Sequence, residues 1–218
     1  MKSIVSKTAI LFFFVLLFSS CRLFFDMDCI NGDKNNYEFY LPFTLYPAQD
    51  TFHINDTIWL HADFSDELLD SNSLNYYKVE NQTFRSSLFF ERIDTSPRLD
   101  ANPDFLLLND TGYISFVQFP TASSFDIAYL YVNSRYKLHA GFVPGKTGLY
   151  AFNLGAVTYQ EVDFQKRCPG ELMNVLFNLN SGAENNYPFM ALSPDTLINS
   201  YPYNKFTYNG YYCFYVVE

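Results

Sequence analysis

The sequence is poor in basic residues. Only 14 of its 218 residues are Lys or Arg, against 23 that are Asp or Glu, and the formal charge at pH 7 is −9. Binding of nucleic acid needs clustered Lys and Arg to neutralise phosphates, and attachment to anionic lipid headgroups needs a polybasic segment. The composition therefore argues against both partners, and solubility explains the acidic charge.

The motifs of common catalytic and metal sites are also missing. The sequence contains no Gly-x-Ser-x-Gly elbow and no metalloprotease helix motif. The three histidines have no Cys or Glu at the spacing of a zinc site; they are His53, His61 and His139. We therefore predict no catalytic residue, no metal and no cofactor. A hydrolase with dispersed acidic residues is the least favoured alternative, because separation in space is not visible in a sequence.

One acidic cluster has two interpretations. It could offer oxygen ligands to calcium, or it could be a solvated loop. Its spacing does not match an EF-hand, and no glycine supplies the bend, so we favour the loop. The cluster consists of Asp63, Asp66, Glu67 and Asp70.

Cysteine is scarce, with four in the chain. A chain of this length buries about 70% of its unfolded surface and needs no dense set of disulfides to fold. One domain is the default, although two small sandwiches would also fit.

Long helical stretches rich in Ala, Leu, Glu and Lys are absent, whereas aromatic residues are abundant. There are 24 Phe and 18 Tyr against 9 Gly. Aromatic and β-branched side chains suit pleated, half-buried surfaces, so we predict an all-β fold.

The clearest strand is predicted at residues 57–64. Ile58 and Leu60 alternate there with Trp59 and His61, so apolar and polar side chains point to opposite faces. Pro42 interrupts an earlier strand at 37–45 and predicts an edge or a bend. Two further strand pairs are expected to turn at 109–112 and at 133–134. About ten short strands, with turns every 8 to 12 residues, are typical of a sandwich or barrel. The other predicted strands are 88–93, 105–108, 113–119, 125–132, 136–143, 149–154, 172–179, 187–192 and 206–217.

The first 21 residues have the layout of a secretion signal. Lys2 and Lys7 precede an uncharged apolar run at 9–18, which small residues follow. A bilayer-spanning helix needs roughly 20 apolar residues, so this run is too short for a stable anchor.

The end of that segment, Phe18, Ser19, Ser20 and Cys21, resembles the lipobox of bacterial lipoproteins. The resemblance implies cleavage before Cys21, diacylglycerol on its sulfur and an acylated N-terminus in the lipid bilayer. It divides the chain into a signal peptide at 1–20, a lipidated tether at 21–36 and a β-sandwich domain at 37–218. Arg22, where Asp would favour the inner membrane, indicates the outer membrane of the cell envelope; the periplasmic and the surface face both stay open. The alternative is an ordinary signal peptide with a chance cysteine.

Near the C-terminus, Asn209, Gly210, Tyr211, Tyr212 and Cys213 resemble the turn, tyrosine and cysteine of a late strand in immunoglobulin domains. The resemblance implies a single antiparallel, immunoglobulin-like β-sandwich. It departs from the family because only five residues follow the cysteine. The chain as a whole also resembles uncharacterised small envelope lipoproteins.

Once Cys21 carries lipid, three thiols allow one disulfide in an oxidising compartment. Cys168 and Cys213 each lie in or beside a predicted strand, so we predict that they pair. Cys29 in the tether is then the odd thiol. The alternative is that all three are buried and free.

The anchor, the β pattern and the missing catalytic motifs together predict a noncatalytic module that binds or scaffolds an envelope protein or glycan. The alternative is a dedicated glycan-binding module. Tyrosine rings can stack on sugar faces, although tyrosine in strands more often packs in the core. The candidate stacking residues are Tyr201, Tyr203 and Tyr208.

Overall fold

The computed structural model describes residues 36–155, 157–159 and 172–218. The chain divides into two compact units, Met1–Tyr37 with Tyr159–Met173, and Glu38–Thr158 with Asn174–Glu218. Almost all of the first unit lies outside the described residues, and with it lie the predicted signal peptide, Cys21, Cys29 and Cys168. The second unit holds the strands and helices of the fold, and we call it the β domain.

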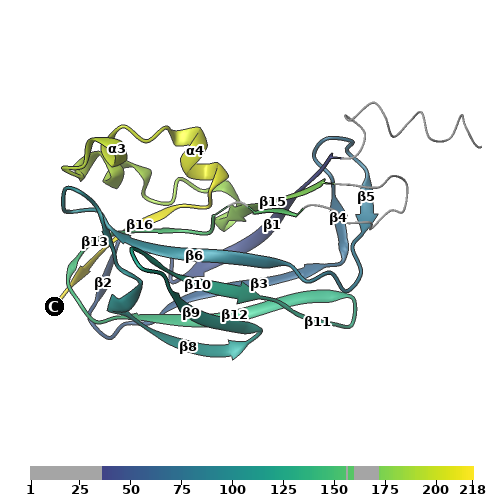
Figure 1. Ribbon diagram of the computed structural model, residues 1–218, viewed down its shortest axis with the longest axis horizontal. Helices are drawn as coiled ribbons and strands as arrows, with labels where there is room; N and C mark the ends of the chain where they lie inside the picture. Colours follow the sequence, from purple (N-terminus) through teal and green to yellow (C-terminus); the bar gives the residue numbers. More distant parts are fainter. Residues whose placement is uncertain (1–35, 156, 160–171) are drawn as a thin grey trace, which may run out of the picture. The chain divides into compact units, whose positions relative to one another are not determined.

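Strands dominate the described residues, so the structure is mostly β, and three short helical segments accompany the strands that the sequence predicted (Figure 1). The first sheet has the strand order β11-β12-β3-β1-β15-β14, with β8 paired to β12. Its strands are β1 (Asn36–Tyr46), β3 (Ile58–Ser65), β8 (Phe105–Thr111), β11 (Leu130–Val132), β12 (Arg135–Pro144), β14 (Val157–Tyr159) and β15 (Leu172–Leu179).

The second sheet has the order β2-β16-β13-β6-β10-β9, with β7 paired to β6. Its strands are β2 (Thr51–His53), β6 (Arg85–Arg92), β7 (Leu99–Asp100), β9 (Tyr113–Gln118), β10 (Ser123–Ala128), β13 (Gly148–Asn153) and β16 (Tyr212–Val217). A separate ribbon joins β4 (Glu67–Leu69) to β5 (Tyr76–Lys78). The prediction of a purely antiparallel sheet is wrong, because β2 runs parallel to its distant partner β16.

Buried and outward residues alternate along the whole of strand β1, with Phe39, Leu41 and Phe43 on the buried side. Pro42 was predicted to mark an edge or a bend, and the edge is wrong, because β1 lies between β3 and β15. Proline removes one backbone donor from a ladder. Pairing with β3 covers Thr44, Leu45 and Tyr46, so Pro42 lies outside that ladder.

The alternation predicted for residues 57–64 is confirmed in β3, where Ile58, Leu60, Ala62 and Phe64 are buried. The strand predicted at 172–179 is also confirmed as β15. Asn178 is exposed there, whereas Met173 and Phe177 are buried.

The predicted hairpin around residues 109–112 is wrong, because its two strands belong to different sheets. Strand β8 pairs with β12, and β9 pairs with β10. Gly112 joins β8 to β9 with a φ of +86°, a conformation that glycine adopts without strain. At 133–134 the turn joins β11 to β12 as predicted, but β10 lies in the other sheet.

The two sheets share an aromatic core. Phe90 of β6 contacts Phe142 of β12 at a centroid distance of 5.1 Å, and Phe125 of β10 contacts Phe142 at 5.4 Å. Both pairs are edge to face, the arrangement that aromatic quadrupoles favour. These contacts join the inner face of the second sheet to the inner face of the first.

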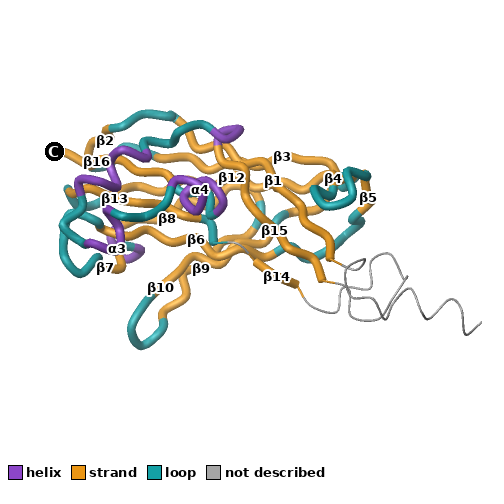
Figure 2. Tube along the Cα trace, turned by 90° about the horizontal axis from the view of Figure 1, so that it is seen from above, coloured by secondary structure: helices purple, strands orange, loops and turns teal. Residues whose placement is uncertain are grey.

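Helical segments cover the outer face of the second sheet (Figure 2). They are η4 (Tyr187–Leu192), α3 (Thr196–Asn199) and α4 (Tyr203–Tyr208). Met190, Ile198 and Phe206 from these segments pack in one cluster with Cys213 of β16 and Ala151 of β13. Strand β16 is therefore buried on both faces. Two short 3-10 turns complete the described elements, η2 (Asn102–Asp104) and η3 (Asn180–Gly182).

The strands predicted at 187–192 and at the start of 206–217 are wrong, because these residues form η4 and part of α4. Pro188 lies in the first turn of η4, and the side chain of Asp195 caps α3 by accepting from the Leu197 N–H. Both are helix-start signals. Among the described helices, none is long and apolar enough to cross a membrane.

Candidate functional site

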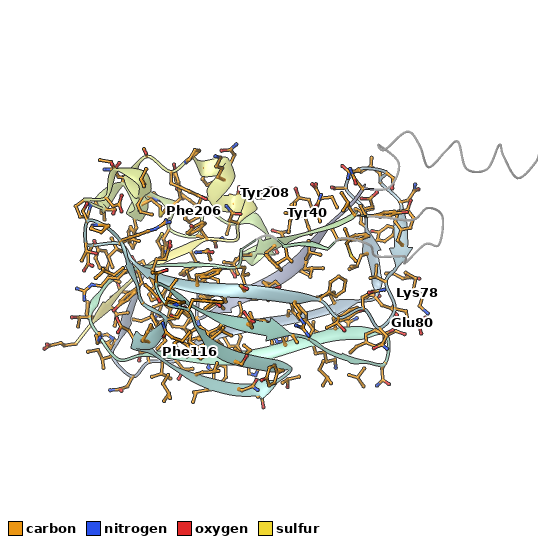
Figure 3. The ribbon with its side chains drawn as sticks, in the orientation of Figure 1. Tyr40, Lys78, Glu80, Phe116, Phe206 and Tyr208 are labelled. Carbon is orange, nitrogen blue, oxygen red and sulfur yellow. The ribbon has the colours of Figure 1, made fainter. Side chains whose placement is uncertain are left out.

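A groove in the β domain is lined by residues from β1, the end of β15, the segment that follows it, and α4. Its volume is about 320 Å³. We call it the Tyr208 groove; Figure 3 labels Tyr40 and Tyr208, which come from β1 and α4. Its lining residues are Tyr40, Phe177, Asn178, Leu179, Gly182, Ala183, Asn185, Asn204, Thr207 and Tyr208.

Helix α4 contributes three side chains to the groove, and they lie on the same face of the helix. Asn204 and Tyr208 are four residues apart and Thr207 is three from Asn204, so the three lie on one face. Phe206 is fully buried between the rings of Tyr187 and Tyr211, at centroid distances of 5.1 and 5.4 Å. This packing fixes the orientation of the face that carries Tyr208.

Strands β1 and β15 each contribute an outward-facing side chain to the groove, because successive residues of a strand point to opposite faces. Tyr40 lies on the outward face of β1, between buried Phe39 and Leu41. Asn178 is likewise outward on β15, between buried Phe177 and Leu179. An aromatic ring and an amide therefore reach the groove from the same sheet.

The lining of the groove is uncharged and mainly apolar, with amide and hydroxyl groups among it. Among the described residues, no charged side chain lines it, and the side-chain amides of Asn178 and Asn204 have no hydrogen-bond partner. The amide of Asn185 is already used, since it donates to the Leu179 carbonyl at 3.3 Å and accepts from Asn180 at 3.0 Å. Two uncommitted amides are therefore available to a ligand.

Two half-exposed aromatic rings flank these amides. Tyr40 is 45% exposed and Tyr208 is 44% exposed. Burial raises the pKa of Tyr40, and the nearby carboxylate of Glu38 and the hydroxyl of Tyr208 raise it further. The Tyr40 phenol is accordingly neutral at physiological pH.

The structure separates the three predicted stacking tyrosines. Only Tyr208 lines the groove. Tyr203 is 45% exposed but lies outside the lining, where its ring contacts Tyr187. Tyr201 packs on Tyr211 at 5.2 Å and accepts a hydrogen bond from Asn209, so its ring belongs to the cluster over the second sheet.

The predicted pairing of Cys213 with Cys168 has no support in the structure. Among the described residues Cys213 is a free thiol, buried in the cluster beneath α3 and α4, and Cys168 lies outside those residues. Burial raises the pKa of the Cys213 thiol, which is typical of an inert structural cysteine. The predicted lipidation site, Cys21, also lies outside the described residues.

The acidic cluster from the sequence is dispersed among separate partners. Asp63 pairs with Arg135 at 2.5 Å, Asp66 accepts from the Tyr131 hydroxyl at 2.6 Å, and Asp70 accepts from the Glu38 N–H at 2.8 Å. Glu67 is exposed. Within the described ranges, no group of three or more His, Cys, Asp or Glu is arranged to hold a metal ion.

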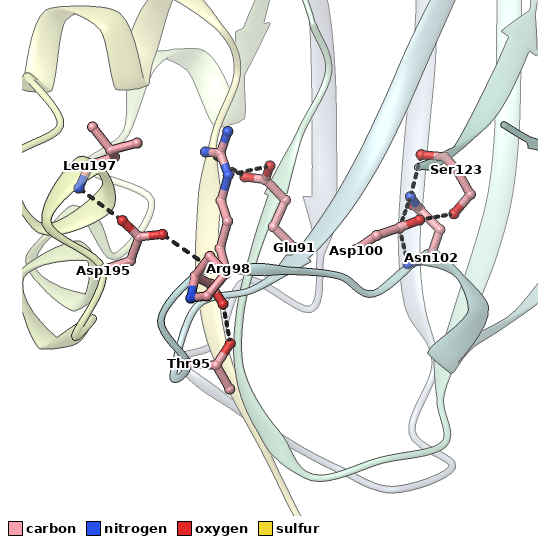
Figure 4. A network of polar contacts seen from close by, with 9 residues as sticks. Glu91, Thr95, Arg98, Asp100, Asn102, Ser123, Asp195 and Leu197 are labelled. Atoms are coloured by element: carbon pink, nitrogen blue, oxygen red, sulfur yellow. Dashed lines mark hydrogen bonds and ion pairs between the residues drawn. The ribbon is translucent and has the colours of Figure 1, made fainter. Parts of the chain in front are cut away.

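A second group of acidic side chains, which includes Glu91 and Asp195, lies beside α3 (Figure 4). Glu91 is 19% exposed and pairs with Arg98 at 3.2 Å. Burial raises the pKa of Glu91 and outweighs the opposing effect of Arg98. Asp195 accepts from the backbone N–H groups of Arg98 and Leu197, at 3.0 and 2.9 Å. These bonds hold the loop after β6 against α3, which is a structural role.

Sequence reasoning missed Tyr40 and the groove amides. Tyr40 falls in the strand predicted at 37–45, but residues 206–208 of α4, which help to complete the groove, fall in the strand predicted at 206–217. Comparisons with protein-family models, with curated proteins and with solved structures found no match.

Proposed function

We propose that this chain is a noncatalytic binding module of a bacterial cell envelope and that the Tyr208 groove binds a neutral glycan. The observation that carries the proposal is the combination of two half-exposed rings, Tyr40 and Tyr208, with the free amides of Asn178 and Asn204. Aromatic rings offer apolar faces to the C–H groups of a sugar. An amide offers both a donor and an acceptor to its hydroxyls.

The uncharged lining supports a neutral ligand rather than an anionic one. A sugar acid or a phosphorylated glycan needs a cation such as Arg to compensate its charge on binding. The groove supplies none, and the chain as a whole carries a net charge of −9.

For the location, we propose that acylated Cys21 anchors the domain in the outer membrane. The basic start, the short apolar run and the small residues before Cys21 support this. Each buried methylene contributes about 0.8 kcal/mol, and two or more chains hold a protein stably. Intact-mass analysis of the purified protein should show an N-terminus at Cys21 with added acyl chains. An N-terminus elsewhere, or an unmodified cysteine, would contradict the anchor.

For the fold type, we propose a β-sandwich formed by the two sheets. The aromatic contacts between β6, β10 and β12 support it. The finer, immunoglobulin-like type rests on the five residues 209–213 alone. In that family the cysteine points between the sheets, whereas Cys213 packs under the helices on the outer face.

The test uses the full chain in detergent and a panel of neutral oligosaccharides, with affinities measured by calorimetry. Tyr208→Ala should weaken binding roughly tenfold, the loss of about 1.4 kcal/mol that one stacked ring supplies. Tyr203→Ala is the matched control, because Tyr203 has almost the same exposure on the same helix but lies outside the groove. Equal effects of the two substitutions, or no binding of any neutral oligosaccharide, would refute the glycan site.

A further inference from the structure

The outward face of β1 continues beyond the groove. Its outward residues after Glu38 are Tyr40, Pro42, Thr44 and Tyr46, and all four are exposed and uncharged. The strand therefore leads from the Tyr208 groove at Tyr40 to a second aromatic position at Tyr46. Positions 40 and 46 are six steps apart along the strand, which corresponds to about 20 Å of backbone at 3.3 Å per residue.

Tyr46 begins a row of side chains that runs across the first sheet. It pairs with Trp59 of β3, and Trp59 pairs with Gly141 of β12. A Cβ atom at Gly141 would lie 3.1 Å from Cζ3 of the Trp59 ring. The glycine thus leaves room for the tryptophan ring beside β12.

Two hydrogen bonds fix the imidazole ring of His139, which lies next to this row. Nδ1 of His139 lies 2.8 Å from a carboxylate oxygen of Asp110, and Nε2 lies 2.5 Å from the Tyr46 hydroxyl. The rings of Tyr46 and His139 are only 13° from parallel, and their tips are joined by the hydrogen bond, so they lie end to end. Trp59 stacks on His139 at 4.6 Å and 7°.

These contacts make the aromatic cluster of Tyr46, Trp59 and His139 rigid before any ligand binds. Its members come from three neighbouring strands, and Asp110 of β8 adds a fourth. Rings held in fixed rotamers lose little conformational entropy on binding. Tyr46 remains 39% exposed.

We propose that the ligand of this protein is an extended neutral polysaccharide, which lies along the outward face of β1 from the Tyr208 groove to the aromatic cluster. The proposal rests on the glycan site proposed above and adds that several consecutive sugars are bound. An extended peptide fits less well, because strand addition needs a free edge, and β1 has strands on both sides. The carboxylates of Glu38 and Asp110, one toward each end, disfavour an anionic chain.

The test measures affinity as a function of ligand length. Neutral oligosaccharides of one series, from disaccharide to octasaccharide, are titrated into the full chain. Affinity should rise with length until the ligand reaches Tyr46 and then level off. Tyr46→Ala should lower octasaccharide affinity roughly tenfold and leave disaccharide affinity unchanged. Tyr76→Ala, at a ring that is 71% exposed on β5, is the control that should change neither.

Trp59 supplies a second readout that needs no substitution, because it is the only tryptophan in the chain. Its fluorescence should change on addition of the octasaccharide and not of the disaccharide. Disaccharide binding that Tyr208→Ala abolishes, without any length dependence or fluorescence change, would overturn the extended site and leave the groove intact. Failure of every oligosaccharide to bind would overturn both.

Discussion

Gly141 of β12 lies opposite Trp59 of β3 in the antiparallel ladder, and the tryptophan ring fills the space that a side chain at position 141 would need. A Cβ atom there would lie 2.8 Å from Thr57 Cγ2 as well as 3.1 Å from the ring. We expect Gly141→Ala to displace Trp59 and to lower the free energy of unfolding by about 1–3 kcal/mol, the usual cost of overpacking. Tryptophan emission and chemical denaturation measure the two effects.

Gly145→Ala is the matched control for that substitution. The Cβ it adds would meet only the Asp104 carbonyl at 3.4 Å, an ordinary contact. It should leave both emission and stability close to wild type. An unchanged tryptophan spectrum in Gly141→Ala would show that position 141 does not determine where the Trp59 ring lies.

Glu91 predicts a pH dependence of stability. Its pKa in the folded protein is raised, chiefly by burial, above the value in the unfolded chain. Between those two values the folded state binds more protons, so stability falls as pH rises through this window. We expect Glu91→Gln, which cannot ionise, to flatten this fall in denaturation curves measured from acid to neutral pH.

The exposed residue Glu67 serves as the comparison for Glu91. Glu67→Gln should leave the pH profile of stability as it is in the wild type. A wild-type profile that is flat across acid and neutral pH would be inconsistent with a raised Glu91 pKa, and so would an unaltered profile in Glu91→Gln.

Cys213 is expected to be inert while the protein is folded. Its thiol is buried under α3 and α4, and burial raises its pKa. Iodoacetamide should therefore leave it unlabelled in the native protein and label it after denaturation, as peptide mass spectrometry can show. Native labelling of Cys213 would contradict its burial, and a Cys168–Cys213 cross-link in an unreduced digest would restore the disulfide predicted from the sequence.

Local patterns in the sequence predicted the strands but not their partners. The alternation at Ile58 and Leu60 depends only on neighbouring residues, and β3 follows it. The turn at Gly112 has the composition of a hairpin, yet the two strands beside it pair with β12 and β10. Pairing depends on which apolar faces meet across the core, and that information is not local.

The site was only partly predictable for a related reason. The abundance of tyrosine near the C-terminus pointed to aromatic recognition, and Tyr208 was named for it. The sequence analysis also predicted strands at 187–192 and 206–217, although Pro188 and Asp195 carry helix-start signals. Tertiary packing decided which rings stay exposed: Phe206 is buried and Tyr208 is not.

The most direct measurement of the central claim follows the side-chain amide resonances of Asn178 and Asn204 while a neutral oligosaccharide is titrated into the labelled full chain. Both amides lack a partner within the described residues and line the groove. We predict that both resonances shift on binding, while that of Asn133, exposed in the turn between β11 and β12, stays in place. Shifts absent at Asn178 and Asn204, with binding detected elsewhere or not at all, would contradict a glycan site in this groove.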